Sequence, residues 1–442
     1  MASYYVDSAA AGSASGADWT NAYLTLGAAL AVATAADTVY VDDGHAETGT
    51  SAITYTCPTT VGLRVVSVDK ALGLTPTTVS AGATITQTSG SVGITINGCA
   101  HFYGISFFTS TAASGLCVLS IAVSVTGPHF LEFDTCVLHG RGTLSTAGLM
   151  LGLNPNLSND EAQIFFLNTQ IGVGILGAGI SCRQARIRGV GISLMGTATI
   201  TSLFKTIAAA TADVDITGSN FSAVTYTNLV DGVANTSAGL FRFSQCKLSV
   251  AGTALLTSSV TVGNVEVFIN DCATGDTHGV FGYANPMGSM ITEGTIKFTG
   301  GAAQQSWKIT TTANASYLSP FYTPWIDYYN ATLSALVPYL EVVRTGSATA
   351  LNDDQIWIET LAKVTASSTA STFATDARGL LAAAAAQATG AGTWDGSPGT
   401  PWYGKLAVAS LTPAETGHIR ARVAVGLASV AGTVYVDPQV RV

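Results

Sequence analysis

Residues 16–43 read GADWTNAYLTLGAALAVATAADTVYVDD, and this stretch decides the predicted fold. Asp18 stands where a helix N-cap belongs, and apolar residues then recur at helical spacing, which predicts an amphipathic helix over residues 19–33. Residues 38–42 are β-branched and aromatic, a composition typical of a strand. The stretch therefore predicts a short helix joined directly to the first strand of a β-rich chain.

The predicted helix has a role at the end of a stack of strands. A stack has an open first layer, and an unpaired strand edge there can recruit another chain. A helix with one apolar stripe, fused to the first strand, would cover that layer. We therefore predict an N-terminal arm and capping helix over residues 1–37, with Asp18, Trp19 and Leu26 as its structural cap residues.

Short apolar strands separated by polar turns recur from residue 53 to about residue 300. Several copies have one local frame, in which a strand, a polar turn and a cysteine follow each other. Copies of this frame end at Cys99, Cys136, Cys246 and Cys272. The 7 cysteines form no CxxC pair, so we predict buried free thiols and no disulfides. The repeat predicts an all-β chain with a parallel β-helix over residues 38–303.

The N-terminal part resembles the entry of right-handed parallel β-helix proteins of the pectate-lyase-like type, especially those found as bacteriophage virion proteins. The residues that carry the resemblance are Tyr4 to Asp7, the turn from Gly16 to Trp19 with Ala22 and Leu26, and Thr38 to Val41 closing on Gly44 and His45. The resemblance implies a right-handed parallel β-helix and a bacteriophage virion protein.

The composition and the strand pattern of the sequence change near residue 304. An aromatic and proline cluster at residues 320–329 is followed by longer strands in which apolar and polar residues alternate. Such alternation is typical of antiparallel strands with one solvent-exposed face. Residues 304–442 are therefore predicted to form an antiparallel β-sandwich, jelly-roll-like, which resembles a C-terminal domain seen on phage structural proteins.

Composition and charge exclude several functions. Charged residues make up only 10% of the 442 residues, and the net charge is −9, so no basic stripe for nucleic acid is expected. The most apolar stretch without charges is interrupted by polar residues and glycines, so no membrane span is expected. The first residues lack the features of a secretory signal, which predicts synthesis in the host cytoplasm.

No motif in the sequence predicts a catalytic, cofactor or metal site. The glycine pattern at residues 172–177 lacks the downstream acidic residue of a dinucleotide site, and the histidines show no metal-binding spacing. Asp213 and Asp215 share a strand face and could meet Glu266 or Asp271 across coils. Acidic residues in solvent-facing turns would give the same sequence pattern as a pair of catalytic carboxylates. We therefore expect no enzymatic activity, no cofactor and no metal.

One basic cluster and one aromatic cluster are candidates for docking on a partner. Arg183, Arg186 and Arg188 lie close together in the sequence, and Trp325 belongs to the aromatic cluster. A solvated face is the ordinary interpretation of such arginines, and docking on an acidic partner surface is the functional one.

Together these features predict a virion structural protein at the capsid surface, a capsid decoration (cement) protein that stabilises the head shell. Its expected partners are the major capsid protein and two further copies of itself in a homotrimer. The alternative is a tailspike or tail fibre that binds or cleaves host surface polysaccharide, and a third hypothesis is a secreted bacterial β-helix adhesin.

Overall fold

The computed structural model divides the chain into two compact units, residues 1–279 and 280–442. Residues 2–436 are described apart from residue 77 and the gaps at 111–116, 124–127, 141–147, 154–161, 174–177, 197–198, 207–210, 233–237, 250–253, 259–263, 275–276, 286–287, 298–302, 312–320, 323–325, 331–338, 346–355, 364–372, 381–401, 408–416 and 426–431.

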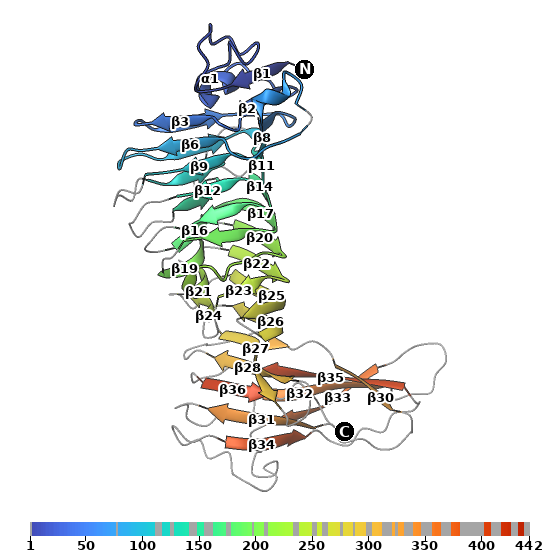
Figure 1. Cartoon of the computed structure of the whole chain (residues 1–442). Helices are drawn as coiled ribbons and strands as arrows, with labels where there is room; N and C mark the ends of the chain where they lie inside the picture. Colours follow the sequence, from blue (N-terminus) through green and yellow to red (C-terminus); the bar gives the residue numbers. More distant parts are fainter. Residues whose placement is uncertain are drawn as a thin grey trace. The chain divides into compact units, whose positions relative to one another are not determined.

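The first unit is a parallel β-solenoid whose coils stack three sheets (Figure 1). The first sheet contains β1 (Ser3–Val6), β2 (Thr38–Asp42), β5 (Arg64–Val68), β8 (Cys99–Tyr103), β11 (Phe130–Asp134), β14 (Ala162–Leu167), β17 (Ala185–Val190), β20 (Thr211–Thr217), β22 (Ala238–Ser244) and β25 (Asn264–Thr274). Neighbouring strands in this order pair in parallel and without a shift of register. The predicted all-β, parallel architecture is therefore confirmed.

The other two sheets complete each coil. The second sheet has the order β4 (Ile53–Thr56), β7 (Ile94–Asn97), β10 (Leu119–Ile121), β13 (Leu149–Leu151), β16 (Ala178–Cys182), β19 (Thr199–Thr206), β21 (Thr225–Gly232) and β24 (Ala254–Ser258). The third sheet has the order β3 (Ala46–Gly49), β6 (Thr84–Gln87), β9 (Ser106–Phe108), β12 (Val137–His139), β15 (Gln170–Gly172) and β18 (Ser193–Met195). The short strand β23 (Lys247–Leu248) pairs with the end of β25.

The core lies inside the coils and consists of side chains that repeat from coil to coil. Because successive side chains on a strand point to opposite faces, every second residue of the first sheet enters this core. Phe102, Phe133 and Phe166 occupy one such inward position on three adjacent strands. The ring centroids lie 5.4 Å apart in the first pair and 5.8 Å apart in the second, and both pairs are stacked. All seven cysteines are buried and free, as predicted.

The first sheet is joined to the third by a tight corner that repeats along the stack. The corner residue has a positive φ in successive coils, namely Gly104, Thr135, Asn168, Gly191, Gly218, Gln245 and Asp271. From Gly104 to Gln245 the N–H of the corner residue donates to a carbonyl of the next coil, as in Thr135 N to Leu167 O at 2.9 Å and Gly218 N to Ser244 O at 2.9 Å. The polar turn of the sequence repeat is therefore a left-handed corner that also links two coils.

The residue after the corner is buried and forms a column that we call the corner ladder: Cys136, Thr169, Ile192, Ser219, Cys246 and Cys272. Thr169 donates its hydroxyl to Phe133 O of the preceding coil at 2.8 Å, and the thiol of Cys246 lies 3.5 Å from Ile216 O in the same way. A small side chain with a weak or strong donor satisfies carbonyls that would otherwise be buried without a partner.

The N-terminal end differs from the prediction in the position and length of its helix. The helix α1 contains only Leu26–Leu30, and its N-cap is Thr25, whose hydroxyl accepts a hydrogen bond from Ala28 N. Asp18 instead accepts from Asn21 N at 2.8 Å and closes a turn. The predicted helix over residues 19–33 and the N-cap role of Asp18 are therefore wrong.

The physical reason is that the edge of β1 forms backbone hydrogen bonds with residue 23, inside the predicted helix. Tyr23 N donates to Tyr5 O at 2.8 Å, and Tyr23 O accepts from Asp7 N at 2.9 Å, so residue 23 is extended beside the edge of β1. A helix cannot include a residue whose backbone groups pair with a strand. Trp19 packs its ring edge against Tyr5 with centroids 4.9 Å apart and donates to Gly73 O at 2.8 Å.

The second unit pairs its strands antiparallel, as the alternating sequence predicted. One series of neighbours is β26 (Thr277–Asn285), β27 (Gly288–Lys297), β28 (Ala303–Thr311), β36 (Gly432–Val436), β31 (Tyr339–Thr345) and β34 (Trp402–Ala407). A second sheet has the order β29 (Phe321–Tyr322), β35 (Gly417–Val425), β32 (Ile356–Lys363) and β33 (Phe373–Leu380), with β30 (Ile326–Asn330) beside β35. Antiparallel pairing begins before residue 304, and packing of the two sheets as a sandwich stays a prediction.

The repeated corner predicts where a side chain is costly. Gly218 has φ +59°, and a Cβ added there would meet nothing within 4 Å, so Gly218→Ala introduces backbone strain alone. We expect a loss of about 1 kcal/mol in the free energy of unfolding, measured by urea denaturation. Gln245→Ala is the matched control, because this corner already holds a side chain at φ 54° and its stability should not change. Equal stability of the two variants would contradict the corner geometry.

Candidate functional site

The outward side of the first sheet carries the candidate site. On β17, Ala185 and Ile187 are buried, whereas Arg186 and Arg188 point outward from the alternate positions. Because neighbouring strands are in register, outward residues of successive coils line up in rows across the sheet. We call the outward side of β14, β17, β20, β22 and β25 the outer face.

Two rows of the outer face hold its functional groups. The central row consists of Phe165, Arg188, Asp215, Arg242 and Phe268 on successive strands. The second row consists of Gln163, Arg186, Asp213, Leu240 and Glu266 on the same strands. None of these side chains belongs to the buried core, so both rows are accessible from outside.

Three arginines converge on one carboxylate in the middle of these rows. Arg188 Nη2 lies 2.7 Å from Asp213 Oδ2, and Arg242 Nη1 lies 3.1 Å from Asp213 Oδ1. Arg186 Nε lies 3.7 Å from Asp213 Oδ2. We call Arg186, Arg188, Arg242 and Asp213 the arginine cluster.

Arg188 is fixed further by the backbone. Its Nη1 donates to Ile187 O at 3.0 Å and to Asp213 O at 3.2 Å. A guanidinium held by a carboxylate and two carbonyls has little freedom, so Arg188 forms the rigid centre of the cluster.

The cluster changes the titration of its carboxylate. Partial burial by itself raises the pKa of Asp213, but the hydrogen bond from Arg188 and the charges of Arg188, Arg242 and Arg186 outweigh it. The pKa of Asp213 therefore lies below its ordinary value, and the carboxylate stays ionised at neutral pH. An ionised Asp213 holds the arginines in place and is not suited to donate a proton.

Aromatic rings stand on both sides of the charged groups. Phe165 is adjacent to Arg188 and packs against Phe130 of the preceding coil, with ring centroids 5.0 Å apart. Phe268 is adjacent to Arg242 and is 38% exposed, which is unusual for a phenylalanine. The outer face thus offers apolar surfaces on either side of a set of charged hydrogen-bonding groups.

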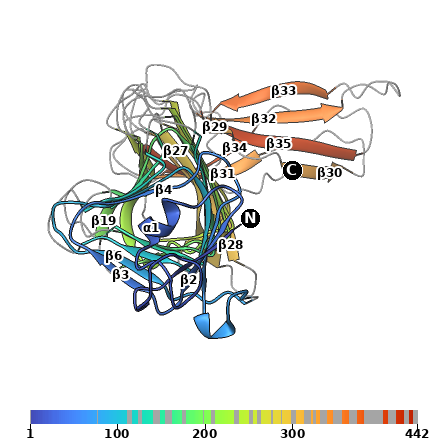
Figure 2. The ribbon, with the colours of Figure 1, turned by 90° about the horizontal axis from the view of Figure 1, so that it is seen from above.

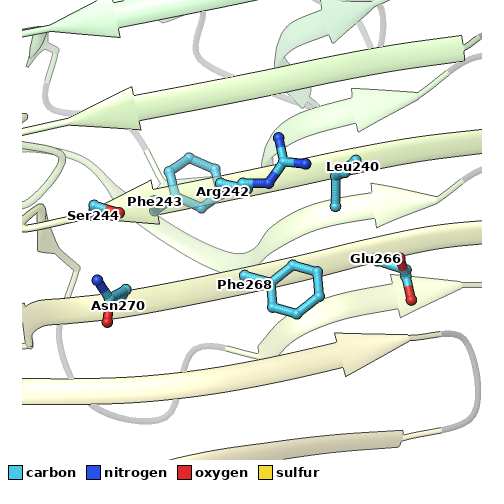
Figure 3. A pocket seen from close by; sticks show the side chains of 7 residues that line it. All are labelled: Leu240, Arg242, Phe243, Ser244, Glu266, Phe268 and Asn270. Carbon is cyan, nitrogen blue, oxygen red and sulfur yellow. The ribbon is translucent and has the colours of Figure 1, made fainter.

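A hollow of about 350 Å³ lies on the outer face between β22 and β25 (Figure 3). Its lining residues are Leu240, Arg242, Phe243, Ser244, Glu266, Phe268 and Asn270. The volume is at the lower end of the range of about 300 to 1,000 Å³ for small-molecule sites. Figure 3 shows the guanidinium of Arg242, the ring of Phe268 and the carboxylate of Glu266 around the same space.

The structure separates the residues that the sequence grouped together. Arg186 and Arg188 lie in the arginine cluster, but Arg183 follows β16 of the second sheet and is half-buried. Burial lowers the pKa of Arg183, because it destabilises the cation. Trp325 lies outside the described residues, so docking of a partner through these four residues stays a prediction.

The acidic residues are also separated. Leu240 stands between Asp213 and Glu266 in the second row, and Asp271 is the corner residue of its coil. Asp213 and Asp215 share the outward side of β20, as predicted. Only Glu266 lines the hollow, and it does so beside an arginine that the sequence analysis did not select.

Arg242, Phe165 and Phe268 were missed, although a signal existed. The five residues of the central row each stand three positions before a corner residue of the repeat. Aligning the copies of the repeat at their polar turns would have placed these residues in one column.

The described part of the chain contains neither a cluster of metal-binding side chains nor a membrane-spanning helix. No group of three or more His, Cys, Asp or Glu side chains there is placed to hold a metal ion. Within the same residues, no helix has the length and apolar character needed to cross a membrane.

Similarity to known proteins is found at the level of structure. No family model matches the chain. No curated protein matches it. Among solved structures, it is similar to the tailspike protein gp49 from Acinetobacter baumannii bacteriophage Fri1, a capsular polysaccharide depolymerase, with 10% sequence identity and a TM-score of 0.23. The match covers 90% of this chain and 81% of that chain.

This finding corrects two predictions from the sequence. The main prediction, a capsid decoration (cement) protein, is wrong, because the matched structure is a tailspike. The prediction that the chain is not an enzyme is withdrawn as well, because the matched protein is a depolymerase.

The arginine cluster predicts a pH-dependent stability. A carboxylate whose pKa is lowered by folding stabilises the protein above the unfolded pKa of about 3.9, and this contribution is lost as the pH falls through the folded pKa. We expect Asp213→Asn to lower the free energy of unfolding by about 1 kcal/mol at pH 7, because the partners are partly exposed. The difference from wild type, measured by urea denaturation, should shrink below about pH 4. A difference that is independent of pH would contradict the role of the charge.

Proposed function

We propose that the chain is a virion-associated tailspike-type protein that binds bacterial surface polysaccharide through its outer face. The observation that carries this proposal is the central row, in which outward-facing aromatic rings stand on both sides of guanidinium and carboxylate groups. The proposal takes up the alternative that the sequence analysis left open.

The chemistry of a polysaccharide fits such a row. One face of a sugar ring is made of C–H groups and packs on an aromatic ring, whereas its hydroxyl groups need hydrogen-bond donors and acceptors at the rim. Phe165 and Phe268 supply the apolar surfaces, and Arg242, Asp215 and Glu266 supply the polar groups.

The solenoid also fits a polymer. Its strands are spaced by about 4.8 Å, so the central row on five strands spans on the order of 20 Å. A row of this length contacts several sugar units at once, and weak contacts with each unit then add to a useful affinity. Binding sites on packed strands are also more rigid than sites on loops.

The proposal also includes a structural role for the N-terminal helix α1. We infer that α1 fills the open end of the first coil, since Leu26, Ala29 and Leu30 are buried and Leu26 N donates to Glu47 Oε2 at 2.8 Å. A view along the stack shows α1 within the outline of the coils (Figure 2). A β-sandwich in the second unit and a homotrimer remain predictions.

The first test is binding of intact polysaccharides by the full chain. We expect biolayer interferometry against a panel of purified bacterial capsular polysaccharides and lipopolysaccharides to identify at least one ligand. Phe268→Ser should weaken that binding about tenfold, because an aromatic contact contributes on the order of 1.4 kcal/mol. The same mixtures, assayed for reducing ends, show whether the bound polymer is also cleaved.

The control for this test is Val61→Ser, which removes a 63% exposed apolar side chain outside the outer face and should leave binding unchanged. Immunogold labelling of virions is expected at the tail. The proposal is overturned if no polysaccharide of the panel binds, or if the label lies over the head.

The second test concerns the capping role of α1. Leu26 is fully buried, so Leu26→Ala should lower the free energy of unfolding by about 2 to 5 kcal/mol and increase association of the chain through its open end. Leu24 is 46% exposed, and Leu24→Ala should have almost no effect. Thermal melting and light scattering measure the two effects. An unchanged melting temperature of Leu26→Ala would contradict the capping role.

A further inference from the structure

We infer that the hollow between β22 and β25 binds a carboxylate-bearing sugar, so that the polysaccharide recognised by the outer face is acidic. This inference rests on the proposed function and names the class of its ligand. It is drawn from the fixed position of one guanidinium and from the apolar and polar groups around the same space.

The site is less negative than the protein as a whole. The whole chain has a net charge of −9. Within the two rows, Arg186, Arg188 and Arg242 stand with Asp213, Asp215 and Glu266, and three positive charges less three negative ones leave 0. A neutral patch on an acidic protein repels an anionic polymer less than the rest of the surface does.

Arg242 is the group placed to bind a carboxylate. Its Nη1 donates to Asp213 Oδ1 at 3.1 Å, which fixes the guanidinium at the edge of the hollow. A guanidinium carries five N–H donors in a planar fork that matches the two oxygens of a carboxylate. The side chain of Arg242 is 42% exposed, so a ligand can reach the donors that face the solvent.

The neighbours of Arg242 complete a site of sugar size. Phe268 follows Arg242 in the central row and gives an exposed ring for the C–H face of the sugar. Ser244 and Asn270 are adjacent at the end of the hollow opposite Glu266. They supply a hydroxyl and an amide for the hydroxyl groups of the sugar. Figure 3 shows these side chains around one space, with Glu266 at its other end.

Glu266 sets the orientation of the ligand. Its carboxylate repels a second carboxylate and accepts hydrogen bonds from hydroxyl groups. The acidic group of the sugar should therefore lie toward Arg242, with its hydroxyl groups toward Glu266. An all-positive pocket would bind phosphate or sulfate equally well, whereas this pocket, with a cation in its middle and an anion at one end, favours a monoanionic hydroxylated ring.

The test uses saturation-transfer NMR on the full chain with two pairs of probes, D-galacturonate with D-galactose and D-glucuronate with D-glucose. At least one acidic sugar is expected to bind about tenfold more tightly than its neutral counterpart, because a charge-assisted hydrogen bond is lost in the neutral sugar. Arg242→Gln should remove this preference. Arg242→Lys keeps the positive charge but lacks the planar set of N–H donors, so it should reduce the preference in part.

The matched control is Arg64→Gln, an exposed arginine on β5 of the same sheet but outside the cluster, which should leave the preference intact. If Arg242→Gln does not fold, as judged by thermal melting, Arg242→Lys decides the question. Equal binding of acidic and neutral sugars, or an acidic preference that survives both Arg242 variants, overturns the inference.

The polysaccharide panel separates this failure from failure of the proposed function. A polymer that binds equally well before and after chemical reduction of its carboxyl groups to alcohols overturns the acidic subsite and keeps polysaccharide binding. Absence of binding to every polymer of the panel overturns both.

Discussion

The corner between the first and third sheets is the constraint on which the rest of the solenoid depends. The corner residues adopt a left-handed conformation, and those from Gly104 to Gln245 give their N–H to the next coil. Four of the buried residues that follow them donate to carbonyls of their own and the preceding coil, namely Cys136, Thr169, Cys246 and Cys272. A strand that slipped by one residue would turn its core face outward and break this column of hydrogen bonds. The corner therefore fixes the register of the coils from β8 to β25, although its residues differ.

The same register creates the outer face. Because every coil is anchored at its corner, a residue at a fixed distance before the corner has a fixed place on the sheet, and five coils together form the central row. Asp213 then serves both stability and function. It holds three arginines that would repel one another, and it leaves Arg242 at the edge of a hollow lined by Phe268 and Glu266.

Local sequence determined much of the fold. The alternation of apolar and polar residues predicted strands, the recurring polar turn predicted the corner, and the small residue after the turn predicted buried thiols at Cys136, Cys246 and Cys272. Alternation also predicted antiparallel strands in the second unit, including β31 and β35. These features depend on each residue and its near neighbours, because the period of a strand and the φ of a turn are local properties.

Only the tertiary structure decided which residues meet. The helix predicted for residues 19–33 does not form at Tyr23, because the backbone of Tyr23 is hydrogen-bonded to the edge of β1. Arg183 is near Arg186 in sequence but lies on another sheet, whereas Arg242 reaches Asp213 from the next coil. Contacts between coils depend on how many residues each loop inserts, and loop length is not fixed by the local pattern. The sequence by itself therefore determined the strands, the corners and the buried thiols, and the stacking of coils decided the arginine cluster and the hollow.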